Sequence, residues 1–156
     1  MSPHQAAARA GAVLCALLAA CSGPSHAVSI KTLAASYLAI ARPANHRLDV
    51  EVGRYDRSRR ASLVVARAAL RSEAVTEATF DRQLLTIRFP PRIAATARAL
   101  VRANEYRIAL TERQARSSSL AGLASLTASH KAADAAVEVQ VRIIRAELGL
   151  PPPQTS

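Results

Sequence analysis

The chain has 156 residues, enough for one modest domain, and half of them are apolar. With only two Phe, three Tyr and no Trp, the apolar part consists of alanine and aliphatic side chains, which favours closely packed helices over a sheet. The formal net charge is +10, but the arginines are spread among acidic residues and are not interleaved with aromatics, so we expect no nucleic-acid partner.

The N-terminal segment predicts export. Residues Ala10 to Ala20 carry no charge and follow a positive charge at Arg9. Eleven helical residues span about 16 Å, roughly half of the hydrocarbon core of a bilayer, so this run is too short for a transmembrane helix. Its length and flanks are those of the apolar region of a signal peptide.

The end of this segment, Leu-Ala-Ala-Cys at residues 18–21, resembles the lipobox of bacterial lipoproteins. The resemblance implies that residues 1–20 are removed as a signal peptide and that the thiol of Cys21 carries a diacylglycerol, so that Cys21 is the lipidation site. Cys15 fits worse, because Ala12 stands where leucine is preferred. The alternative is an ordinary secretory signal that is cut after residues 25–27, with Cys21 incidental.

Both alternatives place the domain outside the cytoplasm. No cysteine follows Cys21, which excludes disulfides, cysteine-ligated zinc and a cysteine nucleophile in the exported domain. The expected organisation is a lipidated tether over residues 21–27, a helical bundle over 28–150 and a proline-rich mobile tail over 151–156.

Four helices are expected, beginning with one over residues 28–52. Pro43 should kink or end that helix, and Gly53 is a plausible stop. A second helix should run over residues 59–87 with Asp56 or Ser58 as its N-cap and a broad apolar face.

Phe89-Pro90-Pro91 marks the clearest boundary, since a residue before proline leaves the helical region and proline suits the first helical position. A third helix should run from Pro91 to residue 126, with room for a bend at residues 117–119 and at Gly122, where its register weakens. The last helix should begin at Asp134, or earlier at Ser129, and end at Gly149. The predicted fold is all-α, an antiparallel bundle of three long helices plus a shorter C-terminal helix.

Glu73, Glu77 and Asp81 follow one side of the second helix at intervals of four. Like charges at this spacing repel, so we expect arginine partners on a salt-bridged bundle face. A metal site formed by these carboxylates is the less favoured hypothesis, because di-iron bundles need a Glu-x-x-His motif and this sequence lacks it. No metal and no cofactor is therefore predicted.

Little else in the sequence indicates catalysis. His46 and His130 are far apart and are expected to be solvated residues at helix ends, and no nucleophile elbow or phosphate-binding glycine loop is present. We therefore predict no enzymatic activity. Five aromatic residues could either fill gaps in an alanine-rich core or line a ligand cavity: Tyr37, Tyr55, Phe80, Phe89 and Tyr106.

Two basic pairs, Arg98 with Arg102 and Arg113 with Arg116, lie on the third predicted helix. Each pair reads either as a solvated face or as a surface drawn to anionic headgroups beside the lipid anchor.

Three stretches of the body, YLAIARPANHRLD, FDRQLLTIRFPP and VRIIRAELGLPPP, resemble small helical lipoproteins of high-GC Gram-positive bacteria. The resemblance implies the outer face of the cell membrane and no particular activity. In a host with an outer membrane, Ser22 after the lipidated cysteine would permit transport of the lipoprotein onward to that membrane.

The predicted function is a lipid-anchored extracytoplasmic protein that binds a partner, such as anionic headgroups or an envelope protein, or supports an envelope assembly. The alternative is a small-ligand carrier with a pocket between its helices.

Overall fold

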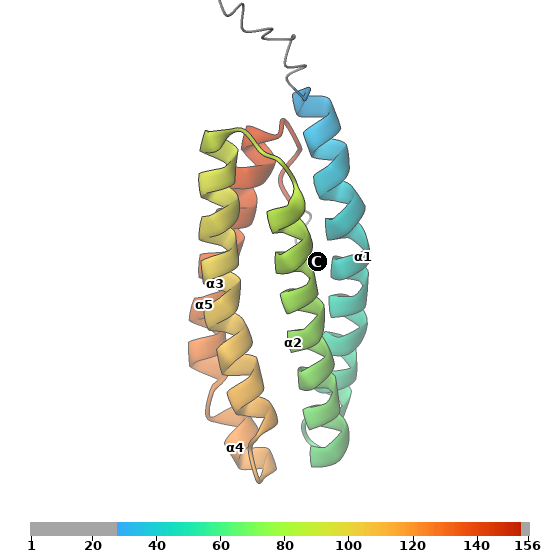
Figure 1. Ribbon diagram of the computed structural model, residues 1–156. Helices are drawn as coiled ribbons and strands as arrows, with labels where there is room; N and C mark the ends of the chain where they lie inside the picture. The colour runs from blue at the N-terminus through green and yellow to red at the C-terminus, as the bar shows by residue number, and fades with distance from the viewer. Residues whose placement is uncertain (1–27, 154–156) are drawn as a thin grey trace, which may run out of the picture.

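Long helices lie side by side in a computed structural model that describes residues 28–153 (Figure 1). The three longest are α1 (Ile30–Ser58), α2 (Leu63–Thr86) and α3 (Pro91–Ala115). A short α4 (Leu120–Ala124) leads into α5 (Thr127–Glu147), the shorter C-terminal helix. The predicted all-α antiparallel bundle is confirmed.

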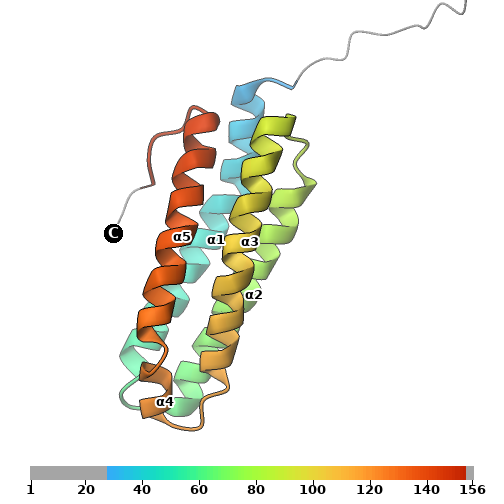
Figure 2. The same ribbon diagram turned by 90° about the vertical axis from the view of Figure 1, so that its left-hand side faces the viewer.

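Neighbouring helices run in opposite directions, as two perpendicular views show (Figures 1 and 2). Helix α1 packs closely on α2, α2 on α3, and α3 on α5. Helices α1 and α5 complete the ring, but their backbones approach each other less closely than those of the other pairs. The seam between α1 and α5 is therefore the place where side chains leave room inside the bundle.

The core divides into two clusters. The larger one contains Tyr37 of α1, Leu84 of α2, Leu100 of α3 and Ile144 of α5, all almost fully buried. Burying one such side chain stabilises the fold by about 1.5–3 kcal/mol relative to leaving it exposed. The smaller cluster lies towards α4 and consists of Ala66, Leu70, Ala115 and Leu123.

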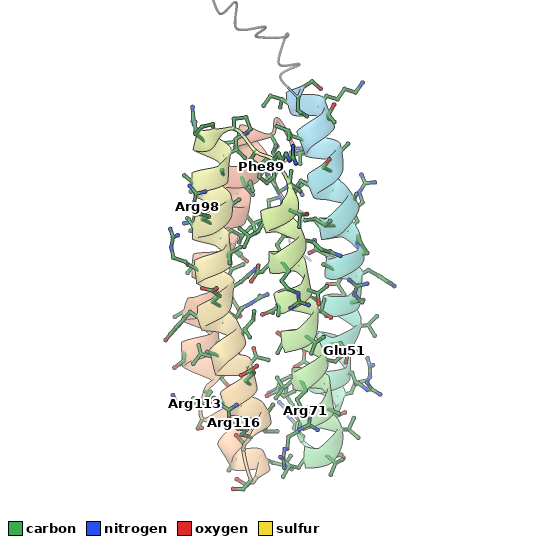
Figure 3. All side chains as sticks on the ribbon, in the orientation of Figure 1. Glu51, Arg71, Phe89, Arg98, Arg113 and Arg116 are labelled. Carbon is green, nitrogen blue, oxygen red and sulfur yellow. The ribbon has the colours of Figure 1, made fainter. Side chains whose placement is uncertain are left out.

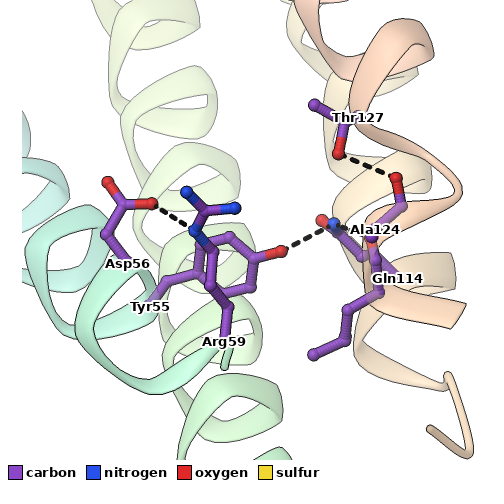
Figure 4. A network of polar contacts seen from close by, with 7 residues as sticks. Tyr55, Asp56, Arg59, Gln114, Ala124 and Thr127 are labelled. Atoms are coloured by element: carbon purple, nitrogen blue, oxygen red, sulfur yellow. Dashed lines mark hydrogen bonds and ion pairs between the residues drawn. The ribbon is translucent and has the colours of Figure 1, made fainter. Parts of the chain in front are cut away.

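A polar network fastens the α4 end of the bundle (Figure 4). The side-chain amide of Gln114 on α3 donates a hydrogen bond to the Tyr55 hydroxyl of α1 at 2.9 Å and another to the Leu123 carbonyl of α4. One buried amide thus connects three helices, and its removal would leave the part-buried Tyr55 hydroxyl and the buried Leu123 carbonyl without this donor.

Helix α1 is longer than the sequence indicated. It continues through Pro43 and Gly53 to Ser58, so the predicted stop at Gly53 is wrong. Pro43 is exposed on the outer side of the helix, where the carbonyl that loses its helical hydrogen bond can be solvated. Packing of α1 against α2 holds the helix together across both weak positions.

The predicted N-caps of the second helix are also wrong, because Asp56 and Ser58 still belong to α1. Ser62 is the N-cap of α2: its backbone is extended and its hydroxyl accepts a hydrogen bond from the Val65 amide at 3.4 Å. Ser29 begins α1 in the same way, accepting from the Thr32 amide at 3.1 Å.

The third predicted helix is divided. Helix α3 ends at Ala115, whose carbonyl accepts a hydrogen bond from Arg67 of α2 at 2.8 Å, and α4 restarts after a cap at Ser119. Helix α5 then begins at Thr127, ahead of both predicted caps, Ser129 and Asp134. Asp134 lies inside α5 because its carboxylate is engaged across the bundle, as described below.

Gly149 ends the C-terminal helix region as predicted, with a positive φ of 66°. The Gly149 amide bonds to the Ala146 carbonyl and the Leu150 amide to the Arg145 carbonyl, the paired pattern of a Schellman cap. The chain then folds back, and the Arg145 side chain donates to the Pro151 carbonyl at 2.7 Å. The last three residues, 154–156, lie outside the described part.

Candidate binding site

A cavity of about 80 Å³ lies at the seam between α1 and α5. It has room for roughly five to eight water molecules, or for a ligand of about that many non-hydrogen atoms, at 10–15 Å³ each. Its wall is formed by Tyr37, Ala41, Ala44, Asn45 and Leu48 of α1, Glu77 and Phe80 of α2, Leu100 and Asn104 of α3, Val137, Val141 and Arg145 of α5, and Pro153. All four long helices and the C-terminal segment therefore meet here.

Two aromatic side chains form part of the apolar wall. The rings of Tyr37 and Phe80 meet edge to face, with centroids 6.4 Å apart and planes at 79°. Of the five aromatics proposed for a cavity, these two are the ones that line it. Tyr55 belongs to the Gln114 network at the α4 end, and Phe89 packs against the larger core cluster. Tyr106 is exposed on α3.

The floor of the cavity is polar and deeply buried. Glu77 is 1% exposed and Asn104 is 3% exposed. The Asn104 amide donates a hydrogen bond to Asp81 Oδ1 at 2.7 Å. Glu77 Oε2 and Asn104 Oδ1 accept no hydrogen bond from any of residues 28–153. Buried acceptors without a partner are uncommon in native proteins and call for an explanation.

Arg107 of α3 links the floor to two other helices. Its guanidinium pairs with Glu77 Oε1 of α2 and, at 3.3 Å, with Asp134 of α5. The expected arginine partner is thus confirmed for Glu77. For Asp81 the expectation is wrong, because its observed hydrogen bond comes from the Asn104 amide. Both Glu77 and Asp81 are also inside the bundle rather than on an exposed face.

Burial makes these carboxyl groups hard to ionise. It raises the pKa of Glu77 to about 8, although the Arg107 guanidinium acts in the opposite direction. Burial likewise raises the pKa of Asp81 to about 6 and shifts the pKa of Glu73 upward. The interior beside the cavity thus holds carboxyl groups that one guanidinium does not neutralise.

Arg145 and Tyr37 bring donors to the cavity wall. The Arg145 guanidinium lies beside the Tyr37 hydroxyl, and burial raises the pKa of that hydroxyl while Arg145 opposes the shift. Asn45 is exposed, and Pro153 is half-buried. By their exposure, Asn45, Arg145 and Pro153 form the mouth of the cavity, while the buried Glu77 and Asn104 form its floor.

The histidines do not join this site. His46 is exposed in the middle of α1. His130 in the first turn of α5 is half-buried, not solvated as expected, and burial lowers its pKa. It lines a separate groove with Glu73 and Asp134. Within residues 28–153, no cluster of three His, Cys, Asp or Glu side chains is arranged to hold a metal ion.

The basic pairs of α3 do not form one patch. Figure 3 places Arg98 near the end of the bundle where α1 begins, and Arg113 and Arg116 towards the other end. Arg98 and Arg113 are about 22 Å apart along the helix, well beyond a screening length of about 8 Å at physiological salt. Arg116 is also partly neutralised by Glu112 at 3.7 Å. If α3 stands perpendicular to a membrane, the two basic pairs therefore cannot both contact its surface.

Sequence reasoning missed Arg107, Arg145 and Asn45. The sequence does contain a signal for the polar residues of the cavity floor. Asn104 occupies a core position in the apolar stripe of α3, and a buried amide needs a polar partner. Arg107 follows it by three residues and so lies on nearly the same side. The residues of the mouth carry no comparable pattern.

Cys21, the predicted lipidation site, lies outside the described residues. Between residues 28 and 153, none of the helices is apolar over a sufficient length to cross a bilayer. Comparisons with protein-family models, with curated proteins and with solved structures found no match to this chain.

Proposed function

We propose that this chain is a lipid-anchored extracytoplasmic protein that binds a small ligand between α1 and α5. The observation that carries the binding role is the cavity, whose wall is mostly apolar and whose floor and mouth hold a few polar groups. Such a combination is typical of small-molecule sites, in which apolar contacts supply affinity and a few polar groups supply orientation. The anchoring role is supported by the lipobox resemblance at residues 18–21.

Lipidation predicts that labelled palmitate is incorporated into the full-length chain, and not into a Cys21→Ala variant, in a lipoprotein-processing bacterium. Two acyl chains, at about 0.8 kcal/mol per buried methylene, hold a protein stably on a membrane, so the wild-type chain should sediment with membranes. The mass of the mature N-terminal peptide should place the cleavage directly before Cys21.

A Cys15→Ala variant is the matched control and should be labelled like the wild type. Label that survives Cys21→Ala, or an unlabelled wild-type chain, would rule out the anchor and favour a freely secreted bundle.

The binding role predicts that filling the cavity removes binding. In full-length chain carrying Cys21→Ala, we expect 1-butanol or butylammonium to shift the methyl NMR signals of Val137 and Val141 with a Kd of about 1 mM or tighter. Ala44→Leu adds three carbons to the cavity wall and should abolish these shifts for both probes.

Ala39→Leu is the control, since Ala39 is exposed on the same helix and does not line the cavity. Absence of methyl shifts with both probes, or shifts that persist in Ala44→Leu, would refute a binding pocket at this seam.

A further inference from the structure

The cavity floor presents acceptors without matching donors. Glu77 and Asn104 come from adjacent helices and line the same cavity, and within the described part of the chain no group donates a hydrogen bond to Glu77 Oε2 or Asn104 Oδ1. Each of these oxygens exposes less than 1 Å² of surface, so ligand binding requires the two side chains to turn towards the cavity. The ligand group that complements these two acceptor oxygens is one that donates several hydrogen bonds and accepts none.

The surrounding charges favour a cation. Glu73, Asp81 and Asp134 lie around Glu77 and share the guanidinium of Arg107 with it. These carboxyl groups outnumber the one guanidinium among them, so the interior becomes acidic once they ionise. A cation at the floor would stabilise ionised Glu77, which burial otherwise disfavours.

The rest of the wall fits a short carbon chain. Leu100, Val137 and Val141 supply aliphatic surface, and the rings of Tyr37 and Phe80 can face a cation. A primary ammonium has three donors and no acceptor, which matches the floor. The guanidinium of arginine carries more atoms on a planar group and, on an alkyl chain, would exceed the space available.

We infer that the ligand of this cavity is a small primary alkylamine, bound as its ammonium ion with the nitrogen between Glu77 and Asn104 and the alkyl part against Leu100, Val137 and Val141. This inference rests on the proposed binding function and specifies its ligand class.

The test compares butylammonium with 1-butanol, which has the same number of non-hydrogen atoms and no charge. Full-length chain carrying Cys21→Ala is titrated with each probe at about pH 8.5, where a raised carboxyl pKa no longer prevents ionisation of Glu77. We expect butylammonium to bind at least ten-fold more tightly than 1-butanol, judged by the methyl signals of Leu100, Val137 and Val141. Glu77→Gln should remove this preference, whereas Glu138→Gln, at an exposed position of α5, should preserve it.

The possible outcomes distinguish an error in the assigned ligand class from an error in the existence of the binding pocket. Binding of 1-butanol as tight as that of butylammonium, or an ammonium preference that survives Glu77→Gln, would overturn the amine assignment and leave the pocket in place. Failure of both probes to shift the three methyl signals would overturn the pocket and the amine together, and would leave the cavity as a site for structural water.

Discussion

At about pH 8.5, above the raised pKa of Glu77, replacing Arg107 with methionine is expected to lower the free energy of unfolding by about 3–5 kcal/mol, the usual cost of leaving a buried charge without its partner. Arg107 pairs with Glu77 of α2 and with Asp134 of α5, so the substitution removes the ionic link among three helices. Urea denaturation of the full-length chain, followed by far-ultraviolet circular dichroism, measures the effect.

Arg98→Met is the matched control, because Arg98 is exposed on the same helix, and it should change stability by less than about 0.5 kcal/mol. A Glu77→Met/Arg107→Met double variant should recover most of the lost stability, since an apolar pair of similar volume replaces the buried ion pair without an orphaned charge. A single Arg107→Met variant within about 1 kcal/mol of the wild type would show that Glu77 does not depend on Arg107.

The free energy of unfolding should fall as the pH rises from about 4.5 to about 8. Glu77 has an ordinary pKa of 4.5 when unfolded and about 8 when folded, so the folded chain binds the proton more tightly. Its contribution is fully present below the unfolded pKa and is lost as the pH rises through the folded pKa, an effect on the order of 5 kcal/mol. Asp81, with its pKa raised to about 6, adds a slope in the same direction at lower pH.

Denaturation midpoints at a series of pH values check this expectation. Glu77→Gln should flatten the profile above about pH 6, because its amide does not titrate, while Glu138→Gln should leave the profile unchanged. Stability of the wild-type chain that rises between about pH 6 and 8, or a slope that persists in Glu77→Gln, would contradict the assignment of this titration to Glu77.

The binding proposal and these two stability predictions concern the same interior. If an ammonium ligand occupies the floor, it supplies the donors that Glu77 and Asn104 lack, and the stability lost on raising the pH should be regained in its presence. Ionisation of the floor then lowers the free energy of unfolding of the ligand-free protein, and ligand binding offsets this loss.

Several boundaries could be predicted from the sequence because the signals are local. The prolines at 90 and 91 end one helix and begin the next, and Gly149 adopts the left-handed conformation that closes a helix. The all-α fold follows likewise from the helical spacing of apolar residues. The lipobox resemblance at Cys21 is also a property of a few adjacent residues, and it stays a prediction.

Helix ends that depend on packing were mispredicted. Gly53 and Pro43 are weak points in an isolated helix, but contact with α2 keeps α1 helical past both. Asp134 has the chemistry of an N-cap, yet its carboxylate binds Arg107 on another helix and α5 starts earlier. In each case a long-range contact outweighs a local preference, which is about 1 kcal/mol for a glycine or an N-cap and about 3 kcal/mol for a proline inside a helix.

The sequence by itself determined that this chain builds a helical bundle with few aromatics, and that acidic residues recur on one side of its second helix. Only the tertiary structure decided that Glu77 is buried at the floor of a cavity that Asn104 of the next helix also lines. The cavity also depends on the spacing of α1 and α5, whose residues are about a hundred positions apart. The packing of the intervening helices sets that distance, and local periodicity carries no information about it.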